Sequence, residues 1–88
     1  MPDLADAMNT WDLALELIHR KGFTVVRHGS PEPLAPSAWE ATNGDGHTMA
    51  ADSPLALLAL CDIWSEWGER WKSVDVERWY DQIVDADE

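Results

Sequence analysis

The sequence predicts an α+β fold in which a helix, a three-stranded antiparallel sheet and a second helix follow one another, with a short third helix at the end. Three observations carry this prediction. Apolar residues recur every three or four positions in residues 4–18 and 53–67, residues 23–26 are β-branched or aromatic, and residues 43–46 read Asn-Gly-Asp-Gly. At 88 residues, the chain is expected to form one domain, residues 1–88, with residues 1–8 and 85–88 frayed.

The first helix is predicted from an apolar stripe. Its members are Leu4, Met8, Trp11, Leu15 and Ile18, at spacings of four, three, four and three. Lys21 ends the predicted helix, because cations favour the last turn and Gly22 can adopt the left-handed cap conformation. Asn9 or Thr10 could instead cap a shorter helix.

A strand is predicted at residues 23–26, directly after the glycine. The next segment, HGSPEPLAPS at residues 28–37, contains three prolines and predicts an extended connection, because each proline lacks a backbone donor. Residues 37–42 and 47–51 flank the Asn-Gly-Asp-Gly stretch and are expected to pair as a hairpin, with helices packed on one face of the sheet.

The second helix has clear boundary residues. Ser53 is a suitable cap, Pro54 suits the first helical position, and Gly68 ends the apolar pattern. Because this helix is apolar over much of its circumference, we expect it to be the central core element. Ser73 is expected to cap the third helix, with an apolar face made of Val76, Trp79, Tyr80 and Ile83.

Composition narrows the classes of partner. Seventeen acids against six bases give a net charge of −11, which repels nucleic-acid phosphates and anionic membranes and suits a protein partner with a basic surface. The single cysteine, Cys61, fits a reducing compartment. Without a signal-peptide pattern or a membrane-spanning apolar run, we expect a cytoplasmic protein with no direct nucleic-acid or membrane contact.

Tryptophans mark the candidate binding surface. Trp64, Trp67 and Trp71 lie within eleven residues, among acids, and Trp71 follows the predicted helix end. We expect Trp11 and Trp64 to be core residues. Trp67, Trp71 and Trp79 are expected to lie at the core edge or to act as exposed anchors, since tryptophan is enriched at interface hot spots. The predicted partner-binding residues are Trp67, Trp71, Trp79, Glu66, Glu69, Asp75 and Glu77.

Catalytic and metal-binding patterns are not expected. Residues 41–52 depart from a calcium loop because Ala41 stands where the first carboxylate is needed. No histidine has zinc-ligand spacing, and Cys61 and the serines lack a nucleophile motif. A minor enzyme hypothesis would require His28, His47 and Asp45 to converge in one cleft, with Glu40 as the alternative acid. We therefore expect no enzyme activity, no metal and no cofactor.

The function predicted from these observations is a small acidic interaction module, such as a regulator or a phage-related accessory protein. Two alternatives stay open. The carboxylates could imitate nucleic-acid phosphates and inhibit a DNA-binding protein. A homodimeric structural subunit could instead bury the same tryptophans, because symmetric dimers are the commonest oligomers.

The stretch WEATNGDGHTMAADSPLALLALCDIW, residues 39–64, resembles short bacterial and prophage proteins of no assigned function. This resemblance implies a Trp-containing strand, a Gly-rich turn and a Ser-Pro-capped leucine helix, and no activity. The order of elements also resembles the double-stranded-RNA-binding fold. Asp52, Ser53 and Pro54 stand where that family has basic residues, so the likeness implies no RNA binding.

Overall fold

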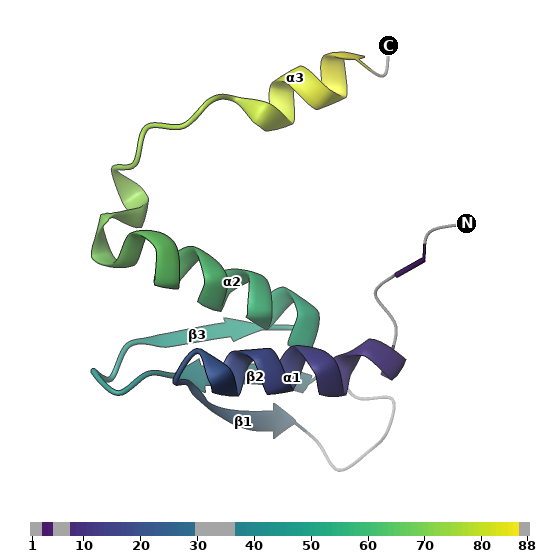
Figure 1. Ribbon diagram of the computed structural model, residues 1–88, viewed down its shortest axis with the longest axis vertical. Helices are drawn as coiled ribbons and strands as arrows, with labels where there is room; N and C mark the ends of the chain where they lie inside the picture. Colours follow the sequence, from purple (N-terminus) through teal and green to yellow (C-terminus); the bar gives the residue numbers. More distant parts are fainter. Residues whose placement is uncertain (1–2, 5–7, 30–36, 87–88) are drawn as a thin grey trace.

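Two helices cover one face of a three-stranded antiparallel sheet in the computed structural model, which describes residues 3–4, 8–29 and 37–86 (Figure 1). The order of elements is a 3-10 turn η1 (Met8–Thr10), α1 (Trp11–Arg20), β1 (Thr24–Gly29), β2 (Ser37–Thr42), β3 (Thr48–Ala51), α2 (Pro54–Trp67), a 3-10 turn η2 (Gly68–Lys72) and α3 (Trp79–Ala86). The predicted α+β class and the order of its elements are confirmed.

Helix α1 is shorter than its apolar stripe predicted. It begins at Trp11, and the preceding residues Met8–Thr10 form a 3-10 turn, whose three-residue period breaks the stripe. Leu4 is 74% exposed, so its predicted place on the buried face is wrong. Lys21 caps the end of the helix and Gly22 adopts a φ of 91°, as expected.

The sheet has the order β1-β2-β3, and both pairings are antiparallel. Strand β1 continues past its predicted end at residue 26, because Arg27, His28 and Gly29 pair with Trp39, Ala38 and Ser37 of β2. The two ends of the predicted connection at 28–37 therefore belong to strands β1 and β2. Its remaining residues, 30–36, lie outside the described part of the chain.

The β2–β3 connection is the hairpin that the sequence predicts. The Asn43 side-chain oxygen accepts hydrogen bonds from the backbone N–H groups of Asp45 and His47, at 3.0 and 2.9 Å. Gly46 has a φ of 88°, the left-handed conformation that favours glycine, whereas Gly44 does not. The Asn43 side chain therefore stabilises the turn.

Helix α2 has the predicted boundaries. The Ser53 hydroxyl accepts a hydrogen bond from the Ala56 N–H at 3.2 Å, and Gly68 ends the helix with a φ of 59°. As expected, α2 is a central core element and contributes Leu57 and Cys61 to the buried cluster, but part of its apolar surface is open. Leu57 is fully buried, but Leu60 and Ile63 are 37% and 42% exposed, because the sheet and α1 together cover only part of the helix.

The core lies between the two helices and the sheet. It consists of Ile18, Phe23, Ala41, Leu57 and Cys61. Ala41 pairs with Val25 on one side and Met49 on the other, so these three side chains form a row across the inner face of the sheet. Trp11 and Trp39 meet edge to face at the margin of the core, with ring centroids 6.0 Å apart.

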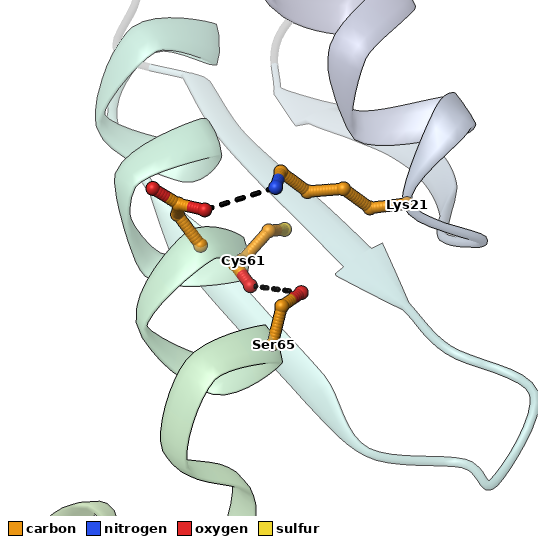
Figure 2. A network of polar contacts seen from close by, with 4 residues as sticks. Lys21, Cys61 and Ser65 are labelled. Atoms are coloured by element: carbon orange, nitrogen blue, oxygen red, sulfur yellow. Dashed lines mark hydrogen bonds and ion pairs between the residues drawn. The ribbon is translucent and has the colours of Figure 1, made fainter.

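One polar contact joins the end of α1 to α2. The Lys21 ammonium donates to the Asp62 carboxylate at 2.9 Å, and one turn further along α2 the Ser65 hydroxyl donates to the Cys61 carbonyl at 2.8 Å (Figure 2). The Asp62 side chain is 71% exposed, so solvent screens this ion pair. It therefore contributes little to the stability of the fold.

The C-terminal part of the chain leaves the two-layer body. Ser73 does not cap the third helix as predicted; its hydroxyl instead donates to the Arg70 carbonyl at the end of η2, and α3 begins six residues later at Trp79. Residues 74–78 between them are non-helical, and α3 projects from the body (Figure 1). The Cα radius of gyration is 15.3 Å, against about 12 Å for a compact chain of this length.

Leu57 and Leu60 test whether α2 has one buried side and one open side. Replacing Leu57, which is fully buried, with alanine is expected to lower the free energy of unfolding by about 2–5 kcal/mol. Leu60→Ala removes the same atoms from a partly exposed position and should cost less than about 1.5 kcal/mol. Urea denaturation measures both; equal losses would mean that Leu60 belongs to the core.

Candidate functional site

An open apolar groove lies between α2, β3 and η2. Its volume is about 250 Å³, and its lining residues are Thr48, Met49, Leu60, Ile63, Trp64 and Trp71. Thr48 is the one polar residue among these six. Trp71 is the most exposed of the large side chains in the lining, at 51%, so its ring forms an outer wall that solvent reaches.

Three elements position the groove. Leu60, Ile63 and Trp64 lie on one side of α2 because their spacings of three and four residues bring them onto neighbouring turns. Met49 comes from β3, where its side chain also packs against the core. Gly68 then breaks the α-helix, so that η2 carries Trp71 into the lining instead of continuing along α2.

The rim of the groove carries both signs of charge. The His47 ring lies 4.5 Å from the Trp64 ring between centroids, and its Nε2 atom lies 3.6 Å from a Glu69 carboxylate oxygen. On η2, the Lys72 ammonium lies 5.5 Å from the centre of the Trp71 ring, within the range of a cation–π contact. The neighbouring Arg70 forms no ion pair with any residue that the structure describes.

The predicted partner-binding residues separate into two groups. Trp71 lines the groove, and Glu69 lies at its rim. Trp67 follows Ile63 by four residues and therefore lies on the same side of α2, where it is partly buried, and Glu66 is an exposed residue of the same helix. The second group is Asp75, Glu77 and Trp79, which lie in the segment beyond η2 and at the start of α3.

Sequence reasoning missed most of the groove lining. Met49, Leu60 and Ile63 were not among the candidates, and Trp64 was expected in the core, which it contacts while also lining the groove. The available indication was the wide apolar arc of α2, which is broader than one sheet and one helix can cover. We interpreted that width as burial; part of it is an open surface.

The histidines do not form the common cleft that the enzyme hypothesis required. His28 pairs with Glu40 across β1 and β2, at 3.7 Å, whereas His47 pairs with Glu69. His28 stands opposite Ala38, four residues along β2 from the hairpin end at Thr42, which is about 13 Å at the usual rise of a strand. Within the described ranges, no group of three His, Cys, Asp or Glu side chains could hold a metal ion.

Cys61 is fully buried between α2 and the end of α1 (Figure 2). Burial disfavours the thiolate and raises the pKa of the thiol from 9.0 to about 11, and the positive charge of Lys21 opposes this rise in part. A thiol of high pKa without solvent access is a poor nucleophile. Cys61 therefore acts as a core residue.

This burial predicts a loss of stability at alkaline pH. The unfolded chain releases the thiol proton above pH 9.0 and the folded chain only near pH 11, so the contribution of Cys61 is complete below pH 9 and is lost as the pH rises through 11. The shift corresponds to about 3 kcal/mol. Denaturation curves between pH 8 and 11 should show a steeper decline for the wild type than for Cys61→Ala; parallel declines would contradict the raised pKa.

No helix within the described ranges is both long and apolar enough to cross a bilayer. Comparison of the chain with protein-family models, curated proteins and solved structures gave no match. The two resemblances noted from the sequence therefore stay predictions, and the function has to be argued from the groove and its surroundings.

Proposed function

We propose that the protein is a small non-enzymatic interaction module that binds a protein partner with a basic surface, and that the groove receives an apolar side chain of this partner. The observation that carries the proposal is the open apolar lining, in which Leu60, Ile63 and Trp71 each remain more than a third exposed. Contiguous apolar surface of this kind is typical of sites where another macromolecule binds. A regulator or an accessory protein would act in this way, by occupying a surface of its target.

The size and chemistry of the groove favour a protein side chain over a small molecule. Its volume of about 250 Å³ is below the range of about 300–1,000 Å³ that is usual for small-molecule sites. Such sites also need several polar groups that converge on the ligand, and Thr48 alone supplies one here. A large ring at an open edge, such as Trp71, is instead typical of the anchors of protein interfaces.

The charge of the molecule supports a basic partner. At a net charge of −11, long-range attraction would speed the approach of a cationic surface and disfavour an acidic one. Glu66 and Glu69 bring this charge close to the groove from α2 and η2. Apolar contact would then supply most of the affinity, and the carboxylates most of the selectivity and the rate.

The first test uses the most basic protein that the wild type retains from host-cell lysate. This partner is purified, and its affinity for wild-type and Trp71→Ala protein is compared. Loss of an interface anchor costs about 2 kcal/mol or more, so we expect at least about a 30-fold rise in Kd, measured by calorimetry. Trp79→Ala removes a similarly exposed ring outside the groove lining and should not weaken binding. Thermal unfolding checks that both variants fold.

An unchanged Kd for Trp71→Ala would exclude the groove as the contact surface. A module that only imitated nucleic acid would give that result, since it would bind through carboxylates and would not need the ring.

A second test separates local charge from net charge. Glu66→Lys/Glu69→Lys should slow association with the same basic partner by about tenfold at low salt, and the difference should shrink at high salt. Asp12→Lys/Glu16→Lys changes the net charge equally, but on α1, which contributes nothing to the groove lining. Stopped-flow measurements compare the two; equal slowing would mean that the carboxylates beside the groove have no special role.

A further inference from the structure

Helix α3 has an apolar face that nothing in the described chain covers. Its apolar residues are Trp79, Tyr80, Ile83 and Val84, which are 57%, 79%, 62% and 42% exposed. Asp81 and Asp85 fall on the opposite side of the helix by their spacing. The helix lies clear of the two-layer body (Figure 1), so an amphipathic helix and an open apolar groove are both exposed in one molecule.

The segment before α3 acts as an extended arm. Residues 73–78 read Ser-Val-Asp-Val-Glu-Arg, in which two β-branched residues alternate with charged ones and no glycine or proline is available for a tight reversal. This arm can span about 20 Å. It starts immediately after Lys72 at the end of η2, next to Trp71 of the groove, and leads to α3, which lies apart from α2 and the sheet (Figure 1).

The groove has positive charge along one edge, on η2, which favours an acidic helix such as α3. Arg70 and Lys72 are two of the six cations of the chain, and both lie on η2 beside Trp71. Neither forms an ion pair with a described residue. Asp81 and Asp85 make α3 negatively charged, so these two cations would attract the helix although both carboxylates lie on the side that faces away from the groove.

We infer that α3 of one copy occupies the groove of a second copy, in a reciprocal dimer with two-fold symmetry. Such an exchange covers both grooves and both helix faces at once, because each copy presents the same two surfaces. Each copy exposes at least half of Trp71, Trp79 and Tyr80, and an aromatic side chain of this kind has about 150–250 Å² of surface. Over two copies, these rings and the aliphatic side chains supply on the order of 1,000 Å², the size at which specific interfaces begin.

This inference rests on the proposed function in one respect, since both use the groove. In the dimer α3 and the external partner compete for it, so self-association sets how much of the groove is free. The two events differ in their response to salt. Two copies of charge −11 repel each other, so screening strengthens the dimer, whereas screening weakens capture of a basic partner.

Disulfide trapping tests the exchange. Full-length Leu60→Cys and Ile83→Cys proteins are mixed in equal amounts and oxidised mildly, and the cross-linked peptides are identified by mass spectrometry. The dimer predicts a bond joining the two substituted positions in different chains, with a yield that rises with salt. The buried Cys61, present in all samples, should not react. Leu13→Cys mixed with Ile83→Cys is the matched control, because Leu13 is an exposed leucine of α1 outside the groove.

A doubly substituted chain, Leu60→Cys/Ile83→Cys, identifies the competing arrangement. If α3 folded back onto its own groove, that chain would close on itself at monomer mass, and the dimer would be excluded. Light scattering of unmodified protein should give twice the chain mass, and Trp79→Ser/Ile83→Ser should return it to one. A wild-type monomer at all salt concentrations would also overturn the inference. If Trp71→Ala still lost its partner in that case, the proposed function would stand without the dimer.

Discussion

The packing of α1 and α2 onto one face of the sheet is the constraint on which the rest of the structure depends. Ile18, Leu57 and Ala41 belong to one buried cluster, and the small side chain of Ala41 lets α2 approach the middle strand. Five residues make up this buried cluster, a small core for a chain that is 45% apolar. Because a small domain buries a smaller share of its surface than a large one, apolar residues are left over.

Those remaining apolar residues are not spread evenly. Most of the large exposed ones lie on α2 beside the groove, on η2 and on α3, whereas α1 and β1 expose Leu13, Leu17 and Val26. The left-handed Gly68 produces much of this arrangement, because it stops α2 and places Trp71 opposite Leu60 and Ile63. A single backbone conformation thus turns a run of tryptophans into a core contact at Trp64 and an outer wall at Trp71.

Charge and apolar contact have separate roles in this molecule. The excess of seventeen acids over six bases acts over distance and opposes the approach of a second copy, while the groove and α3 act only on contact. The ion pairs of the described residues are mostly exposed, so they contribute little to stability. Stability therefore comes from the small core, and in the proposed function selectivity comes from the carboxylates beside the groove.

Local chemistry was sufficient to determine most of the fold. Ser53 and Gly68 delimit α2, Gly22 ends α1, and Asn43 with Gly46 forms the hairpin, since each needs only its own conformation and its near neighbours. The end of β1 was not predictable in this way. Its last residues are strand because β2 pairs with them, and such pairing joins distant parts of the chain.

The candidate site depended even more on the tertiary structure. The sequence by itself determined that tryptophans and acids gather near the C-terminus, and that Trp71 lies beyond a helix end. Only the folded chain decided that Met49 would join Leu60 and Ile63 across two elements, and that Trp79 would lie on a separate arm. The physical reason is that exposure is not a property of a residue or of its period along a helix. It is decided by how much of each apolar face the neighbouring elements are large enough to cover.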